Sequence, residues 1–243
     1  MSTPNKALIL AAGVGNRLAP VTDRLPKSLV PINGKPIIFK QVENLIDNGV
    51  SDITIVAGYK SDMLEEAIHG VWPEIHIVNS TNYSNTNNMY SAWLGIRSMF
   101  PDGSIVPFLM MNADVFFDSS VLTELLATSS PNAVVVDIGR YIEESMKVVE
   151  KDGRLIAISK TITPEEAIGS SIDVYKFGID GGRAFFAKCS EYIKVKNELR
   201  HWSEVALNDA FAEAEFRVCQ LVGRWVEIDN LQDLTAAIEL FSA

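Results

Sequence analysis

Short apolar runs alternate with segments of helical period along the first 140 residues. Residues 7–10 have no polar position and predict a strand that is buried on both faces. Residues 36–49 place apolar positions every three or four residues, beginning at a proline and ending at a glycine, as helices do. The alternation continues with strands at 52–58, 74–79, 105–114 and 132–139 and helices at 61–70, 87–100 and 119–129. Strands and helices that alternate at this spacing predict βαβ units around a mostly parallel sheet.

The pattern changes after residue 140. Residues 146–160 alternate apolar and polar positions on both sides of Asp152-Gly153, a dipeptide typical of a tight hairpin turn. No linker rich in glycine and serine separates the two halves. We therefore expect one α/β domain over 1–243, Rossmann-like, with a mixed, mostly parallel sheet and an inserted antiparallel hairpin portion. The remaining expected elements are strands at 171–178, 215–222 and 224–230 and helices at 181–195, 201–214 and 231–241.

The composition limits the partners of this domain. The formal net charge is −10, so most of the surface repels nucleic acid and anionic membranes, and we expect neither as a partner. No run approaches the roughly 20 apolar residues of a membrane span, and the first residues lack the pattern of a signal peptide. The two cysteines, Cys189 and Cys219, form no CxxC pair, which favours a reducing, cytoplasmic setting. No motif specifies an oligomeric state.

Glycines and prolines gather directly after the first predicted strand. Gly13 and Gly15 lie at its carboxyl end, where open α/β sheets bind ligands. The segment is not a dinucleotide-binding GxGxxG motif, because Leu18 stands at the third glycine position, and this argues against a dinucleotide-dependent oxidoreductase. It is not a P-loop either, because Gly34-Lys35 is followed by a proline. The loop nevertheless has the backbone freedom that phosphate binding requires.

Charged side chains of both signs are expected beside this loop. Arg17 offers a planar fork of donors and Lys27 a compact charge, a pair suited to a polyphosphate. Asp114 ends the strand in "MMNADVFF", and Asp229 ends a short strand in "VEIDN". Two carboxylates at one sheet edge, facing a triphosphate, are what Mg²⁺ requires, because it prefers oxygen ligands.

The pattern LAAGxGxRLxPxTxxxPKxLxPxxGKP, present over residues 10–36, resembles the signature of nucleotidyltransferases that make nucleotide-diphosphate sugars and related activated alcohols. The resemblance extends over nearly the whole chain. It implies that 1–140 bind the nucleotide and 141–243 the acceptor, that Arg17 and Lys27 are catalytic, and that Asp114 and Asp229 hold Mg²⁺. The nucleotide-binding loop that it implies comprises Leu10, Ala11, Ala12, Gly13, Val14 and Gly15.

The segment "NSTNYSNTNNMYSAW" resembles the corresponding stretch of the bacterial phosphocholine cytidylyltransferase branch. Sugar-phosphate thymidylyltransferases instead carry a stretch rich in glutamine and proline. Amide side chains near the base can hydrogen-bond to a cytosine edge, so CTP is the expected nucleotide. The additional candidates for nucleotide binding are Asn79, Tyr83, Asn88 and Asn112.

The acceptor is less defined. Lys160 matches a lysine that contacts the acceptor phosphate in relatives, and Lys147 is a second candidate on the facing strand. Trp202 aligns with an aromatic residue of the phosphocholine branch and could hold a quaternary ammonium by a cation–π contact. However, Met146 stands where that branch is expected to carry another aromatic, so choline is one candidate among several. The remaining acceptor candidates, suited to an amino or hydroxyl group, are Asp173 and Glu204.

The expected reaction is an Mg²⁺-dependent attack of an acceptor phosphate or phosphonate oxygen on the α-phosphorus of CTP, with release of pyrophosphate. No covalent enzyme intermediate is implied, because these motifs contain no activated serine, cysteine or histidine. One alternative is a sugar 1-phosphate nucleotidyltransferase that uses UTP, dTTP or GTP. Another is a nucleotide-sensing module without catalytic activity.

Overall fold

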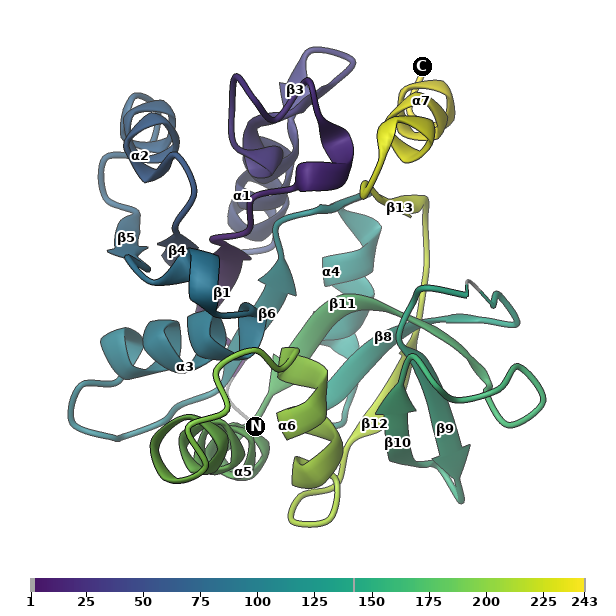
Figure 1. Ribbon diagram of the computed structural model, residues 1–243. Coiled ribbons are helices and arrows are strands. Elements are labelled where there is room, and N and C mark those ends of the chain that lie inside the picture. Colours follow the sequence, from purple (N-terminus) through teal and green to yellow (C-terminus); the bar gives the residue numbers. More distant parts are fainter. Residues whose placement is uncertain (1–2, 142, 243) are drawn as a thin grey trace.

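The computed structural model describes residues 3–141 and 143–242 of the chain (Figure 1). Within these residues the main sheet has the strand order β10-β9-β11-β6-β1-β4-β5, and β8 pairs with both β11 and β12. The pairs β6·β1, β1·β4, β4·β5 and β8·β12 are parallel, whereas β11 runs antiparallel to β6, β8 and β9. The predicted α/β fold with a mixed sheet and an antiparallel hairpin is confirmed. The bounds of these strands are β1 Lys6–Ala11, β4 Asp52–Ala57, β5 His76–Asn79, β6 Phe108–Asn112, β8 Ala133–Ile138, β9 Lys147–Lys151, β10 Arg154–Ser159, β11 Gly169–Phe177 and β12 Arg217–Gln220.

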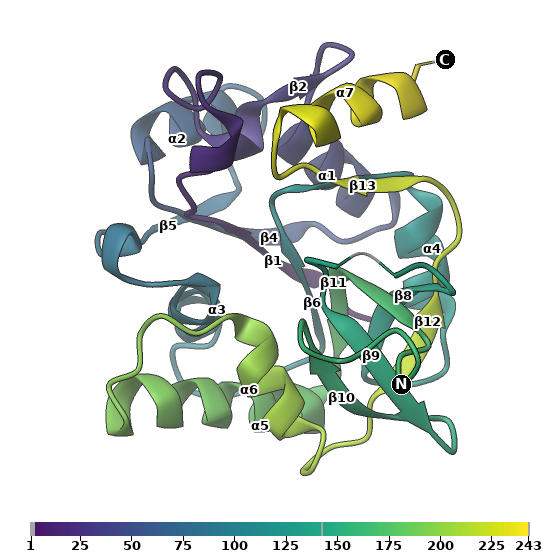
Figure 2. The same cartoon turned by 45° about the vertical axis from the view of Figure 1, so that its right-hand side comes forward.

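Helices cover both faces of this sheet (Figures 1 and 2). Leu8 and Leu10 of β1 pack in one core with α3 (Asn88–Met99), α5 (Ile179–Ser190) and α6 (Ser203–Ala210). Ala7 and Ile9 point to the opposite face and pack with α1 (Ile37–Asp47), α2 (Ser61–His69) and α4 (Ser120–Ala127). Successive strand side chains alternate between faces, so a run that is apolar throughout is buried on both.

The segment after β1 is irregular and packs beside the C-terminal helix α7 (Leu231–Leu240), as Figure 2 shows. It contains the short helices η1 (Asn16–Leu18) and η2 (Lys27–Leu29) and the small hairpin of β2 (Pro31–Ile32) and β3 (Lys35–Pro36). Leu18 and Ile32 share a small core with Ile228 and Ala237. This packing fixes the N-terminal loop against the last segment of the chain.

A second small sheet brings two distant carboxylates to one place. β7 (Val115–Phe117) pairs antiparallel with β13 (Trp225–Glu227), with Val115 opposite Glu227. The backbone N–H of Ile228 also donates to the carbonyl oxygen of Asp114 at 2.9 Å. Asp114 and Asp229 therefore lie on neighbouring backbones although 115 positions separate them in the sequence.

Some element boundaries differ from the prediction. The helix expected at 181–195 ends as α5 at Ser190 and continues as one wider turn, η4 (Glu191–Val195). The helix expected at 201–214 is α6 alone, and Trp202 lies at its N-cap position. A further 3-10 turn, η3 (Tyr83–Asn85), precedes α3. Among the described residues no helix is both long and apolar enough to span a membrane.

Candidate active site

One pocket opens at the carboxyl ends of β1 and β6, between the N-terminal loop and the antiparallel portion of the sheet. Leu10 of β1 lies opposite Asn112 of β6, and the N–H of Ala113 donates to the carbonyl oxygen of Leu10 at 3.0 Å. This is the edge at which open α/β sheets bind their ligands. The predicted site residues that line the pocket are Leu10, Ala11, Ala12, Gly13, Arg17, Lys27, Tyr83, Asn88, Asn112, Asp114, Lys160, Asp173, Trp202, Glu204 and Asp229.

The glycine-containing loop packs tightly on Lys27. Gly15 has a φ of +70°, which favours glycine, and a Cβ at this position would lie 3.0 Å from the Cβ of Lys27. Thr22 donates its hydroxyl hydrogen to the carbonyl oxygen of Gly15 at 3.0 Å and holds the turn. Val14 and Gly15 are outside the pocket lining. That these two residues take part in nucleotide binding stays a prediction. They would act through the conformation of the loop and not through direct contact.

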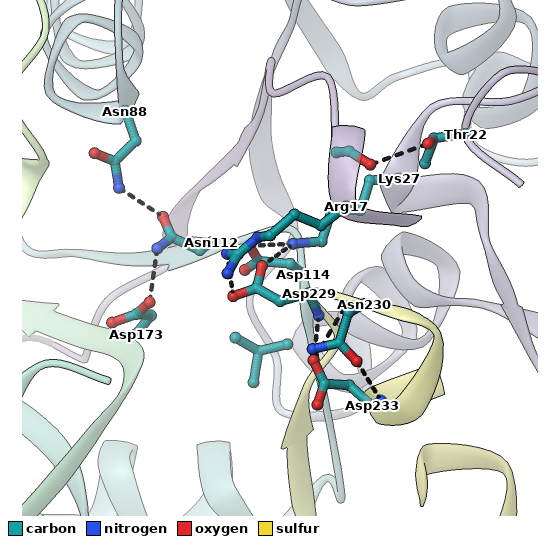
Figure 3. A network of polar contacts seen from close by, with 12 residues as sticks. Arg17, Thr22, Lys27, Asn88, Asn112, Asp114, Asp173, Asp229, Asn230 and Asp233 are labelled. Atoms are coloured by element: carbon teal, nitrogen blue, oxygen red, sulfur yellow. Dashed lines mark hydrogen bonds and ion pairs between the residues drawn. The ribbon is translucent and has the colours of Figure 1, made fainter. Parts of the chain in front are cut away.

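Lys27 bridges the two predicted metal ligands (Figure 3). Its Nζ donates to Asp114 Oδ2 at 2.9 Å and to Asp229 Oδ1 at 2.7 Å, and only 13% of its side chain is exposed. Burial lowers the pKa of Lys27, but the two carboxylates outweigh this effect and raise it above its ordinary value. Burial likewise raises the pKa of Asp229, whereas Lys27 and then Arg17 lower it, and the net pKa is lowered. The site therefore holds a charged ammonium beside the ionised carboxylate of Asp229.

Arg17 reaches the same carboxylate from the solvent side. Its guanidinium donates to Asp229 Oδ2 at 2.7 Å and to Glu144 Oε2 at 2.5 Å (Figure 3 shows the first contact). More than half of the Arg17 side chain is exposed, so these ion pairs are open to exchange with a phosphate ligand. Arg17 thus connects the N-terminal loop with the C-terminal segment and with the loop that precedes β9.

A third carboxylate joins the predicted pair. Oxygen atoms of Asp114, Glu227 and Asp229 lie within 4.8 Å of one another, and Asp114 Oδ1 is buried without a hydrogen-bond partner among the described residues. Burial raises the pKa of Glu227 to about 9, with Asp173, Asp114 and Asp229 adding to the effect. An oxygen-only cluster with an unpartnered buried oxygen fits a hard divalent cation. Sequence analysis missed Glu227, although its position two residues before Asp229 in an extended segment places both on one face.

Amide side chains connect the nucleotide side of the pocket with β11. Asn112 donates to Asp173 Oδ2 at 2.9 Å, and Asn88 Nδ2 lies 3.4 Å from Asn112 Oδ1 (Figure 3). Asn88 Oδ1 accepts a hydrogen bond from the backbone N–H of Ser203 at 2.8 Å, which fixes the start of α6. Asn79 does not line the pocket, because its amide donates to the hydroxyl of Ser61 instead. The nucleotide contact of Asn79 stays a prediction that this geometry does not support.

The acceptor candidates divide into two groups. Lys160 Nζ lies 4.8 Å from the ring centroid of Trp202, and both line the pocket. Lys147 does not: it is 4% exposed and donates to the backbone carbonyl oxygens of Glu143 and Ser145. The acceptor contact of Lys147 stays a prediction that this geometry does not support, and its side chain holds the loop that carries Glu144.

The last two acceptor candidates, Asp173 and Glu204, share one hydrogen-bond partner. Tyr175 Oη lies 2.9 Å from Asp173 Oδ1 and 2.8 Å from Glu204 Oε1, and Ser203 also donates to Glu204 Oε1. Asp173 has a φ of +58° where the pairing of β11 with β8 is irregular. Such bulges redirect side chains and are frequent beside functional sites. Here the bulge turns a carboxylate into the pocket.

Comparisons with known proteins identify the family of this chain. The sequence model of the nucleotidyl transferase family matches residues 6–147. A choline-phosphate cytidylyltransferase of Streptococcus pneumoniae is 45% identical over 92 residues, which are 37% of this chain and 38% of that protein. A CTP:phosphoglutamine cytidylyltransferase of Campylobacter jejuni is 26% identical over 96% of this chain and 99% of its own length.

The fold has a close match among solved structures. The CTP:phosphocholine cytidylyltransferase of Streptococcus pneumoniae superposes with a TM-score of 0.79 over 98% of this chain and 99% of that one, at 23% identity. The predicted fold class and the predicted family resemblance are both confirmed.

Proposed function

Because the chain belongs to the nucleotidyl transferase family, we propose that it is an Mg²⁺-dependent cytidylyltransferase. It transfers CMP from CTP to a small phosphorylated or phosphonylated acceptor and releases pyrophosphate. The observation that carries this proposal is the position of Lys27 between the carboxylates of Asp114 and Asp229, beside the glycine-containing loop. Nucleotidyl transfer requires cations and metal-binding carboxylates at one place, because positioning and charge stabilisation accelerate it.

Two observations support CTP and a small acceptor. The relatives reported above are cytidylyltransferases by name, and their named substrates are choline phosphate and phosphoglutamine. The acceptor side of the pocket also favours a small charged molecule, because it combines Lys160 and Trp202 with the half-buried carboxylate of Asp173 and the buried one of Glu204. Lys160 supplies a cation for the acceptor phosphate or phosphonate.

In the proposed reaction an acceptor oxygen forms a bond to the α-phosphorus as the bond to the bridging oxygen of the β-phosphate breaks. Lys27 stabilises the negative charge on the α-phosphate, and Arg17 stabilises the charge that develops on the leaving pyrophosphate. Both side chains exchange carboxylate partners for phosphate oxygens when the nucleotide binds. A metal ion, when bound by Asp114, Glu227 and Asp229, supplies Lewis-acid neutralisation of the phosphates.

The test is pyrophosphate release with Mg²⁺ from CTP, UTP, dTTP or GTP, each combined with phosphocholine, 2-aminoethylphosphonate or glucose 1-phosphate. We expect release from CTP with a small phosphorylated or phosphonylated amine. Release only from another nucleotide with glucose 1-phosphate would contradict the proposal. Binding of CTP without release in any combination would support a sensing module instead.

A further inference from the structure

The pocket contains a hydrogen-bonded group that nucleotide binding does not use. Asp173 on β11, Tyr175 on the same strand and Glu204 on α6 form a continuous hydrogen-bonded chain, in which Asp173 and Glu204 line the pocket and Tyr175 is buried. Figure 3 shows Asp173 joined through Asn112 to Asn88, to one side of the cluster that contains Lys27. These residues lie where the antiparallel portion of the sheet meets the nucleotide side, and they face the acceptor region.

This group has one hydrogen-bond donor fewer than its two carboxylates require. The phenol of Tyr175 carries one hydrogen, so it donates to either Asp173 or Glu204 but not to both. Asn112 donates to the other oxygen of Asp173, and the Ser203 hydroxyl donates to Glu204. Neither carboxylate forms an ion pair with a lysine or arginine in the parts of the chain that the structure describes.

The missing donor is energetically unfavourable because the Glu204 carboxylate is buried. Glu204 is 2% exposed, and its Oε2 accepts no hydrogen bond from the described residues, although Glu204 lines the pocket. Burial, followed by the charges of Glu204 and Asp114, raises the pKa of Asp173 to about 8. A buried carboxylate and a half-buried one without a cation therefore need either an added proton or a positively charged ligand.

The aromatic part of the site does not form a cage. Trp202 is 44% exposed, and the ammonium of Lys160 already lies 4.8 Å from its ring. Met146, not an aromatic residue, lines the pocket nearby. A quaternary ammonium has no N–H and would leave the Asp173 and Glu204 oxygens without a donor, whereas a protonated amine offers up to three.

We propose that the acceptor carries, in addition to its phosphate or phosphonate, an ammonium group with at least one N–H that donates to Asp173 and Glu204. This inference rests on the proposed nucleotidyl transfer, because it assigns the substrate class of that same site. Lys160 binds the anionic end of the acceptor, and the carboxylate pair binds the cationic end. Specificity for a protonated amine over choline follows, since the carboxylates require donors.

The test compares four acceptors that differ at one group: 2-aminoethyl phosphate, its N,N-dimethyl and N,N,N-trimethyl derivatives, and 2-hydroxyethyl phosphate. Their binding to the full chain is measured by calorimetry with Mg²⁺ and a non-hydrolysable CTP analogue, and pyrophosphate release from CTP is measured in parallel. We expect the trimethyl and hydroxyl compounds to bind at least about 10-fold more weakly than the primary amine. Equal or tighter binding of either compound, or no binding of the primary amine, would overturn the inference.

The variants Asp173→Asn and Glu204→Gln test whether these two carboxylates bind the ammonium group. Each should weaken binding of the primary amine about 10-fold or more and change binding of 2-hydroxyethyl phosphate by less than about 3-fold. Asp47→Asn, an exposed change at the end of α1, is the matched control. A uniform loss for all four acceptors would contradict a specific ammonium contact. Amine binding that follows this pattern without pyrophosphate release would contradict the proposed function but not the ammonium site.

Discussion

The ammonium nitrogen of Lys27 lies 2.7 Å from Oδ1 of Asp229, although 202 positions separate the two residues in the sequence. The contact joins the first irregular segment of the chain to the last one, and Asp114 completes it from the turn between β6 and β7. In the proposed mechanism this cation between two carboxylates contributes both to stability and to phosphate chemistry. The first two predictions separate these roles.

Lys27→Ala should lower kcat by a factor of about 10² to 10³, the loss typical of one preorganised electrostatic group. The measurement is pyrophosphate release at saturating CTP and acceptor. Arg24→Ala removes an exposed cation from the same segment and should retain activity within about 2-fold. Turnover by the Lys27 variant that is comparable with the control would exclude the assigned role.

The same variant should be less stable without metal. Removing the ammonium leaves Asp114 and Asp229 as uncompensated, partly buried charges, and breaking a buried ion pair costs about 3–5 kcal/mol. We expect a large decrease in the free energy of unfolding, measured by urea denaturation in EDTA, and partial recovery with Mg²⁺. If Mg²⁺ fails to stabilise this variant more than the wild type, the carboxylates do not form the metal site.

Glu227→Gln should weaken metal activation, since it removes one of three clustered carboxylates. The Mg²⁺ concentration that gives half-maximal activity should rise about 10-fold, within the range reported for losses around metal sites. Glu239→Gln on the exposed side of α7 is the control. An unchanged Mg²⁺ requirement would place Glu227 outside the metal site.

Glu144→Gln should improve nucleotide binding. Arg17 must exchange Glu144 for a phosphate, so removing this exposed partner should lower the KM for CTP about 2- to 5-fold. The effect on stability should remain below about 1 kcal/mol, as for other exposed ion pairs. Glu143→Gln changes a neighbouring exposed carboxylate and should leave the KM for CTP unaltered. A similar decrease in KM in both variants would contradict competition between Glu144 and the nucleotide for Arg17.

The Asp173 carboxyl makes stability depend on pH. Its pKa is about 8 in the folded protein against 3.8 ordinarily, because burial and the charges of Glu204 and Asp114 raise it by more than the hydrogen bonds with Tyr175 and Asn112 lower it. Between about pH 4 and pH 8 the folded protein holds a proton that the unfolded chain releases, so stability falls as pH rises through this window.

Asp173→Asn removes this titration, and asparagine tolerates the positive φ of the position. Without ligands, the variant and the wild type should melt at similar temperatures at pH 5. At pH 8 the variant should melt higher by roughly 5 °C, as expected for about 2 kcal/mol in a chain of this size. A difference that does not change with pH would contradict the assigned burial of charge; Asp47→Asn controls for loss of a carboxylate alone.

The sequence was sufficient to predict the location of the site residues that follow the ends of strands. Arg17, Lys27 and Asp114 lie where the first and sixth strands end, because parallel strands deliver their carboxyl ends to one sheet edge. Asp229 could be predicted from its position after a short strand. The comparisons leave the roles of these residues untested, but the structure brings all four together.

Residues that depend on loops or on irregular pairing could not be placed in this way. Lys147 has the composition of a ligand contact, but its side chain turns to the carbonyl oxygens of the preceding loop. The contact of Tyr175 with Asp173 and Glu204 requires the bulge of β11 and the docking of α6, neither of which has a sequence signal of its own. Asn79 binds Ser61 because β5 and α2 are adjacent in space.

The most direct test of the central claim follows the α-phosphorus. CTP labelled at the α-phosphate is incubated with Mg²⁺, 2-aminoethyl phosphate and the protein, and the products are separated and identified by mass spectrometry. We predict that the label appears in a CMP–acceptor conjugate in equal amount to the pyrophosphate released, and that Lys27→Ala forms both about 10²- to 10³-fold more slowly. Label recovered only in CTP or in free CMP would contradict nucleotidyl transfer by this site.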